Sequence, residues 1–131
     1  MYYGSCLCKK VTFKIIGDFK GFFLCHCNRC QKQTGSAHAA NLFSQTAKLE
    51  WLTGQDHINI FHLPNTRFMK SFCSTCGAAL PSIQESGRLL VPAGCLDSEV
   101  PIQPDAHIFM GSRAKWDNNL ERIKMFEKLP S

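Results

Sequence analysis

Cysteines constrain this chain more than any other feature of its sequence. Eight occur among 131 residues, and seven of them fall into three tight groups, namely Cys6 and Cys8, then Cys25, Cys27 and Cys30, then Cys73 and Cys76. Such spacings are typical of metal sites, and a glycine directly after the last group permits the tight turn of a zinc knuckle. No secretory signal or membrane-spanning run is visible, so we predict a cytoplasmic protein whose reduced thiols bind zinc rather than form disulfides.

The number of clustered thiols predicts two different zinc sites. Seven thiolates cannot complete two four-thiolate sites, but they suffice for one closed site and one three-thiolate site with an open position. Structural zinc is normally fully coordinated, whereas catalytic zinc keeps a place for water or substrate. The favoured partition joins the two pairs, Cys6, Cys8, Cys73 and Cys76, and leaves Cys25, Cys27 and Cys30 for the second ion. An alternative assigns Cys8 or His26 to the triple group and leaves one site incomplete.

The remaining cysteine and the histidines receive simpler interpretations. Cys95 stands alone and is expected to be a core residue. His26 lies between two predicted ligands, so its side chain should point away from the metal, where it could orient the site or carry a proton. No metal role is predicted for the four other histidines, His38, His57, His62 and His107, because none has a ligand partner at motif spacing.

An open three-thiolate zinc site favours sulfur chemistry. Three thiolates weaken zinc as a Lewis acid towards oxygen but leave it suited to a soft fourth ligand such as a substrate thiol, which becomes deprotonated on binding. The predicted reaction is thiol addition to an electrophilic carbon, or its reverse. Arg29 and Lys32 either receive an anionic thiol or are surface charges, and Thr34-Gly35-Ser36 either binds a carboxylate or forms a plain turn.

Short alternating apolar segments predict a mostly β domain that spans residues 1–131, built of antiparallel strands with few short helices. Ile58–Leu63 and Arg67–Phe72 are expected to form a hairpin around Pro64-Asn65. Helices are expected at Asn28–Gln33 and Leu120–Lys128. The net charge of +5 comes from basic residues scattered along the chain, which argues against a nucleic-acid partner. Further strands are expected at Val11–Ile15, Phe22–Leu24, Leu49–Leu52, Arg88–Pro92 and His107–Met110.

The sequence resembles the glutathione-dependent formaldehyde-activating enzyme family, which also includes centromere protein V. The matching segments follow in order over nearly the whole chain, and the combined cysteine pattern is highly specific. They are Gly4-Ser5-Cys6-Leu7-Cys8, Cys25-His26-Cys27-Asn28-Arg29-Cys30, Thr34-Gly35-Ser36-Ala37, Phe72-Cys73-Ser74-Thr75-Cys76-Gly77, Gly94-Cys95-Leu96-Asp97, Pro104 with His107-Ile108-Phe109, and Ser112-Arg113-Ala114-Lys115-Trp116.

This resemblance implies a fold, two metal sites and a reaction. The fold is all-β and β-tent-like, shared with methionine sulfoxide reductase B and a zinc-binding partner of Rab GTPases. The implied ligands are Cys6, Cys8, Cys73 and Cys76 for structural zinc, and Cys25, Cys27 and Cys30 for catalytic zinc. The implied partners are glutathione, or a similar small thiol, and formaldehyde, which form S-(hydroxymethyl)glutathione in a reaction classed as carbon–sulfur lyase chemistry.

Two other functions compete with this interpretation. A non-catalytic module could use both zinc ions to hold a surface for a protein or nucleic-acid partner, but it would be expected to show a continuous basic face. Methionine sulfoxide reduction would need a redox-active cysteine that is free of metal, and Cys95 is the only spare one. The open position at the triple group favours the enzyme.

Overall fold

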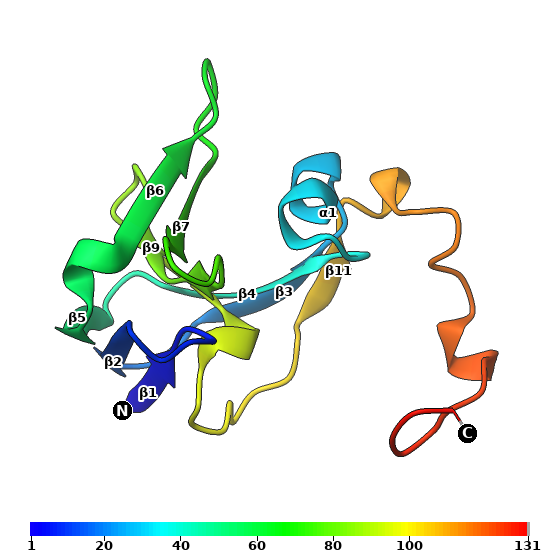
Figure 1. The fold of residues 1–131 in the computed structure, drawn as a ribbon. Helices are drawn as coiled ribbons and strands as arrows, with labels where there is room; N and C mark the ends of the chain where they lie inside the picture. The colour runs from blue at the N-terminus through cyan, green and yellow to red at the C-terminus, as the bar shows by residue number, and fades with distance from the viewer. Residues whose placement is uncertain (131) are drawn as a thin grey trace.

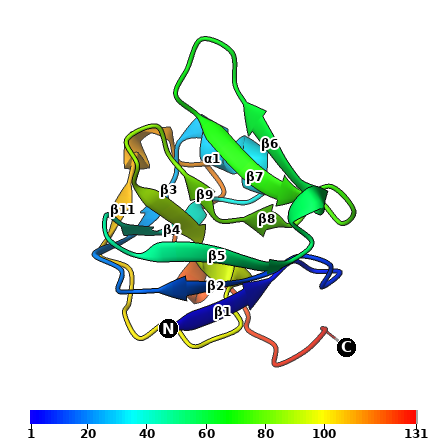
Figure 2. The same ribbon diagram turned by 90° about the vertical axis from the view of Figure 1, so that its left-hand side faces the viewer.

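The computed structural model describes residues 1–130, and short strands in three sheets make up most of its regular structure (Figures 1 and 2). One sheet has the order β1-β2-β5, another has the order β11-β3-β4-β10-β9, and a third has the order β6-β7-β8. The predicted all-β class is therefore confirmed. The strands are β1 (Tyr2–Ser5), β2 (Thr12–Ile16), β3 (Gly21–Cys25), β4 (Ala39–Ser44), β5 (Lys48–Thr53), β6 (Ile58–His62), β7 (Met69–Cys73), β8 (Ala79–Leu80), β9 (Ser82–Ile83), β10 (Leu89–Pro92) and β11 (Ala106–Ile108).

Strand pairing follows the sequence pattern with one exception. The expected hairpin is present, since β6 and β7 pair antiparallel from Ile58 opposite Cys73 to His62 opposite Met69. All named strand pairs are antiparallel except β11 with β3, which run parallel in the register Ile108 to Cys25. A parallel pair needs a long crossover, and here most of the chain separates the two strands.

Helical structure among the described residues is confined to one α-helix and four short 3₁₀ turns. The helix α1 (Asn28–Thr34) confirms the first predicted helix, whereas only the turn η4 (Leu120–Arg122) forms in the second predicted helical segment. That prediction was wrong because a short helix is marginal without tertiary packing, and the apolar side chains of this segment are exposed. The other turns are η1 (Gln55–His57), η2 (Ala93–Cys95) and η3 (Met110–Ser112).

The main core lies between the sheets and draws on alternate residues of several strands. Its fully buried side chains include Phe13, Ile15 and Leu42. Cys95 is partly buried against this core, as expected of a packing residue. Position 4 beside this core has room only for glycine, because a Cβ there would overlap the Phe13 ring and lie 2.6 Å from the Cys95 carbonyl oxygen.

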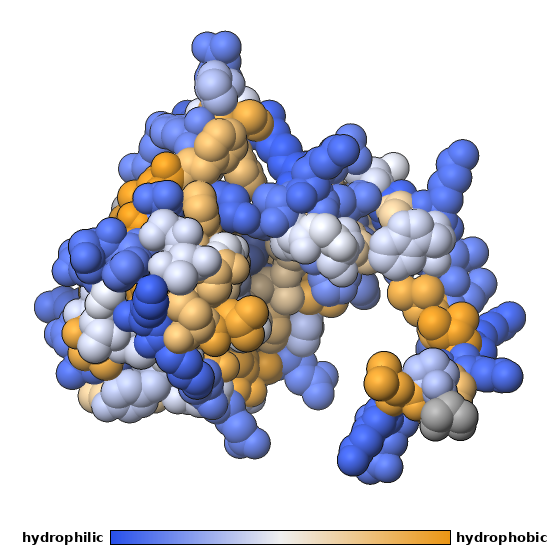
Figure 3. All heavy atoms as spheres, viewed as in Figure 1, coloured by the Kyte–Doolittle hydropathy of each residue, from blue (hydrophilic) through white to orange (hydrophobic). Residues whose placement is uncertain are grey.

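Apart from Asp117, which contacts His26, the C-terminal segment after η3 extends from the body of the molecule as an arm (Figure 1). Several large apolar side chains are exposed along it, and Figure 3 shows apolar atoms on the arm away from the body. The most exposed large apolar side chains of the arm are those of Trp116, Ile123, Met125, Phe126 and Leu129. No helix among residues 1–130 is long and apolar enough to cross a bilayer.

Candidate metal centres and active-site cavity

Four cysteines from the two sequence pairs come together in one cluster, the four-thiol cluster. The Sγ atoms of Cys6, Cys8, Cys73 and Cys76 all lie within 4.8 Å of one another. The Sγ–Sγ distance is 3.6 Å between Cys6 and Cys8 and 3.9 Å between Cys8 and Cys73. Four thiolates at about 2.3 Å from a tetrahedral zinc ion would stand about 3.8 Å apart. The cluster therefore fits a metal ion bound by four sulfurs.

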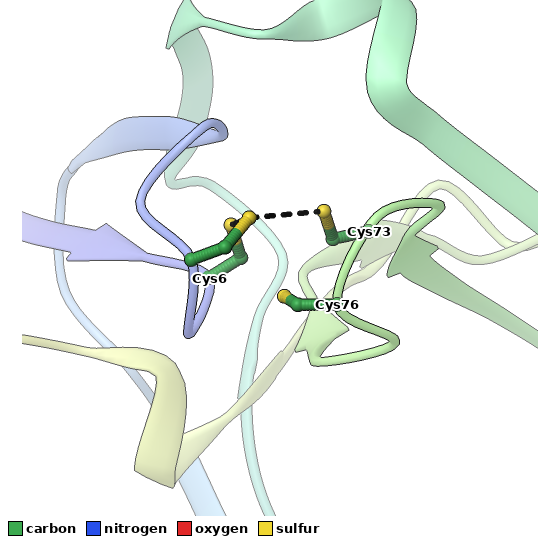
Figure 4. A group of neighbouring side chains, drawn as sticks. Cys6, Cys73 and Cys76 are labelled. Atoms are coloured by element: carbon green, nitrogen blue, oxygen red, sulfur yellow. Dashed lines mark hydrogen bonds between the residues drawn. The ribbon is translucent and has the colours of Figure 1, made fainter.

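Two tight turns present these thiols to each other, as Figure 4 shows for Cys6, Cys73 and Cys76. In the turn after β7, the Gly77 amide donates to the Cys73 carbonyl (2.7 Å), and Gly77 has φ 75°. In the turn after β1, the Lys9 amide donates to the Cys6 carbonyl (3.1 Å), and Lys9 has φ 69°. Each turn thus ends on a left-handed residue directly after its second cysteine. The glycine at 77 was the sequence signal for one of them.

Backbone amides and neighbouring thiols shift the protonation of this cluster in opposite directions. Hydrogen bonds from the backbone of Ala78 and of Cys8 lower the pKa of Cys76 to about 6. At Cys8, the Lys10 backbone lowers the pKa, but burial and the other thiols together raise it to about 11. Because the four thiols lie close together, ionisation of one of them disfavours ionisation of the others. A divalent cation among them would remove this effect, which is the behaviour expected of a metal site.

The three remaining clustered cysteines form a second group, the three-thiol cluster, where β3 ends and α1 begins. The Sγ atoms of Cys25, Cys27 and Cys30 lie within 4.8 Å of one another. Cys27 is the N-cap of α1, and its Sγ accepts a hydrogen bond from the Cys30 amide (3.4 Å). Ile108 of β11 packs against the cluster. A single short segment thus supplies all three thiols.

Burial dominates the electrostatics of the three-thiol cluster. It raises the pKa of Cys25 and of Cys30, and the other two thiols raise that of Cys30 further. At Cys27 burial opposes ionisation, but the Cys30 amide and the neighbouring thiols lower the pKa. One thiolate is therefore favoured at the helix cap, and a metal ion is needed before all three ionise. Neither His26 nor Cys8 belongs to this group of ligand atoms.

A cavity of about 210 Å³ opens beside Cys25 and Cys30. Its lining residues on β3 and β4 are spaced two apart, and such side chains point to the same face of a sheet. The floor of the cavity is therefore one face of the five-stranded sheet. The opposite face of the same strands carries core residues such as Leu42 and Val91. The floor residues on β3, β4 and β10 are Phe23, Cys25, Asn41, Phe43, Leu90 and Pro92.

Two basic side chains, Lys70 and Arg88, line this cavity. Lys70 Nζ donates to the carbonyl of Gln33 (3.2 Å). The guanidinium carbon of Arg88 lies 4.3 Å from the centre of the Phe43 ring, which is a cation–π contact. The cavity thus combines thiols at one end, an apolar and amide-bearing wall, and positive charge.

The basic residues singled out in the sequence lie elsewhere. Arg29 and Lys32 are exposed on α1 and line an adjoining groove, which shares Lys70 with the cavity but does not include the cysteines. Spacing alone could not show which of two adjoining hollows each side chain of this seven-residue helix lines. No sequence pattern pointed to Lys70 or Arg88, which are brought to the cavity by β7 and by the turn before β10.

Thr34-Gly35-Ser36 forms the end of α1 rather than a ligand site. Gly35 is the left-handed C-cap (φ 68°), and its amide donates to the Gln31 carbonyl. The Thr34 hydroxyl donates to the Cys30 carbonyl (2.7 Å) and accepts from the Ser36 amide (3.2 Å). These polar groups are therefore used in capping the helix, and the plain-turn interpretation holds.

A histidine cluster centred on the buried His26 was missed by the sequence analysis. His26 is 1% exposed, its Nε2 lies 2.8 Å from His107 Nδ1, and its Nδ1 lies 3.1 Å from Asp117 Oδ2. The His38 ring centre is 5.0 Å away. His26 thus points away from the thiols as expected, but His38 and His107 are not isolated. No sequence spacing signals this cluster, because its members are far apart along the chain.

The histidine cluster joins the cysteine segment to the chain after β11. Burial lowers the pKa of His26, the nearby His38 lowers it further, and Asp117 opposes both. The Gln31 side-chain amide also bridges the carbonyls of His26 (2.7 Å) and Ser112 (2.9 Å). These contacts fix the loop that carries the three thiols.

Comparison with known proteins gives a family and a fold. The family model described as glutathione-dependent formaldehyde-activating enzyme matches residues 1–112, which include both cysteine clusters. No curated protein matches the chain. A crystal structure of a Rhodobacter sphaeroides protein is similar, with a TM-score of 0.59 and 20% sequence identity over 80% of this chain and 98% of that one. At this identity the similarity concerns the fold alone.

Proposed function

Because this chain belongs to the glutathione-dependent formaldehyde-activating enzyme family, we propose that it is a zinc-dependent carbon–sulfur lyase. It would form and cleave the adduct of an aldehyde, such as formaldehyde, with glutathione or a similar small thiol. The observation that carries the proposal is the three-thiol cluster, which lies beside a cavity large enough for part of a substrate. Residues 1–131 would act as one domain in the cytoplasm, where thiols stay reduced.

The two clusters would have different roles in this enzyme. Structural zinc would be held by the four-thiol cluster, and catalytic zinc by Cys25, Cys27 and Cys30. When bound at the three-thiol cluster, zinc would supply a position at which a substrate thiol loses its proton near neutral pH. Two zinc ions per chain would thus be required, one for the fold and one for the reaction.

The chain itself would position the reactants. In the adduct-forming direction, the thiol sulfur bonds to the aldehyde carbon, the carbonyl π electrons move to oxygen, and that oxygen takes up a proton. The balance equals one thiol plus one aldehyde, so no oxidant or reductant is needed. The apolar side chain of Phe23, two residues from Cys25 on β3, would exclude water around the reacting carbon. The contacts of His26 with His107 and Asp117 would hold the three-thiol loop in place.

Magnetisation-transfer NMR tests the proposal through the rate of glutathione–formaldehyde exchange. We expect the zinc-loaded protein to accelerate exchange beyond the spontaneous rate, and Cys27→Ala to lose the acceleration. The buffer blank and Cys27→Ala are necessary controls, because formaldehyde and thiols also react unaided. No acceleration by zinc-loaded wild type would contradict the proposal and favour a non-catalytic, zinc-held interaction module.

A further inference from the structure

Positive charge is unevenly distributed around the three-thiol cluster. Lys70 and Arg88 line the cavity that holds Cys25 and Cys30, whereas Arg29, although next in sequence to Cys30, lines only the adjoining groove, which shares Lys70 with the cavity. Among the described residues, neither Lys70 nor Arg88 has a carboxylate within ion-pair distance. Two unpaired cations beside a thiol-lined cavity indicate an anionic ligand.

Arg88 is held in position for such a ligand. Its guanidinium stacks on the ring of Phe43, which itself forms part of the cavity floor. The neighbouring Glu85 lies 3.8 Å from Arg67, and no ion pair joins it to Arg88. A planar guanidinium presents a fork of donors that matches a carboxylate. Arg88 can therefore offer these donors without first breaking an ion pair.

The sheet register sets the separation between Arg88 and the thiols. Cys25 pairs with Ala39 on β4, whereas Arg88 covers Phe43, four residues further along the same strand. At about 3.3 Å per residue this is about 13 Å along the strand, before the reach of the side chains shortens it. Lys70 lies nearer the cluster, since it bonds to Gln33 of α1. A ligand that joins the thiols to Arg88 must be longer than a single amino acid.

We propose that Arg88 is a specificity-determining residue of the thiol site, which selects peptide-length thiols that carry a carboxylate remote from the sulfur. This inference rests on the proposed thiol chemistry of the three-thiol cluster and adds which thiols are accepted. Lys70 provides a second positive charge closer to the sulfur. Short or neutral thiols reach the three-thiol cluster but gain nothing from Arg88.

Isothermal titration of the zinc-loaded protein with three thiols tests the inference without an activity measurement. Glutathione is long and carries carboxylates, cysteine is short and carries one, and 2-mercaptoethanol is neutral. We expect Arg88→Ala to weaken glutathione binding about tenfold or more and to leave the other two thiols within about twofold. Arg88→Lys should restore part of the affinity, because the charge remains but the fork is lost.

Arg29→Ala is the matched control, because this arginine is close to the cysteines in sequence but outside the cavity. It should bind all three thiols as the wild type does. The inference is overturned if Arg88→Ala binds glutathione as well as the wild type does, or if Arg29→Ala is the variant that loses affinity. If wild type binds none of the thiols, the proposed function fails first; if it binds all three equally, only the role of Arg88 fails.

Discussion

The two cysteine clusters use the same ligand type but differ in how the chain supplies it. The four-thiol cluster joins two turns whose cysteines Cys8 and Cys73 are 65 positions apart, whereas the three-thiol cluster comes from one segment of six residues, Cys25 to Cys30. If a bound metal is treated as a cross-link, a loop of about 65 residues gains roughly 4 kcal/mol from closure, and one of about six residues gains roughly 2 kcal/mol. The first cluster is therefore suited to hold the fold together.

The surroundings of the two clusters also suit one cluster to stability and the other to chemistry. Turns that end at Lys9 and Gly77 complete the four-thiol cluster, and its four sulfurs satisfy a tetrahedral ion. The three-thiol cluster lacks a fourth sulfur and lies beside the cavity lined by Lys70 and Arg88. The comparison teaches that one metal-binding motif can serve stability or chemistry, depending on what the fold leaves next to it.

The largest expected effect separates the clusters by stability. Cys76→Ser should lose one zinc ion and the cooperative thermal transition, because it opens the site that joins the first turn to the middle of the chain. Cys30→Ser should keep a cooperative transition. Circular dichroism melts and zinc analysis by mass spectrometry would measure both.

Cys95→Ser is the control for this pair, since Cys95 lies outside both clusters. It should keep both zinc ions and a cooperative transition, because it removes only a packing contact of the core. Equal loss of folding in Cys76→Ser and Cys30→Ser would contradict the division into a stabilising and a reactive site.

The second largest expected effect is the loss of exchange activity when the three-thiol cluster is altered. Cys30→Ser should reduce the acceleration of glutathione–formaldehyde exchange by at least about tenfold, or about 1.4 kcal/mol, while the four-thiol cluster stays loaded. The physical reason is that a hydroxyl is a poorer zinc ligand than a thiolate. The exchange assay described above measures this, and full activity in a variant that has lost one zinc ion would refute the assignment.

Stepwise metal removal should resolve the clusters in a single sample. Titration with a chelator should remove the ion at the three-thiol cluster first, because three protein ligands bind less tightly than four. Activity should then disappear while the circular dichroism spectrum is unchanged, and the fold should be lost only at higher chelator concentration. Simultaneous loss of both ions and of structure would show that the clusters are not independent.

The smallest expected effect compares two left-handed glycines. Gly77 follows the four-thiol cluster and Gly35 caps the helix that carries Cys30, and a Cβ at either position would meet no other part of the molecule within 4 Å. Alanine at either site should therefore cost about 1 kcal/mol through backbone strain alone. Gly77→Ala should lower the melting temperature and the zinc affinity of the four-thiol cluster, whereas Gly35→Ala should affect the three-thiol cluster. Equal changes in melting temperature and in the zinc affinity of both clusters in the two variants would contradict the different roles of the clusters.

The sequence alone determined the all-β class, the β6–β7 hairpin, the helix at Asn28 and the three groups of cysteines. These features depend on local periodicity, turn residues and spacing, which are visible in a short window of residues. The ligand role of each cysteine and the extent of the domain stay predictions. Where local preference lacked packing partners, as in residues 120–128, the predicted helix was wrong.

The tertiary structure alone decided what surrounds the three-thiol cluster. Asp117 and His107 reach His26 because β11 pairs parallel with β3, and Arg88 reaches the cavity because β10 pairs with β4. Arg29 looked better placed in sequence, yet it lines the adjoining groove and not the cavity itself. Contacts between strands far apart in the chain depend on register and sheet order, and neither leaves a local pattern in the sequence.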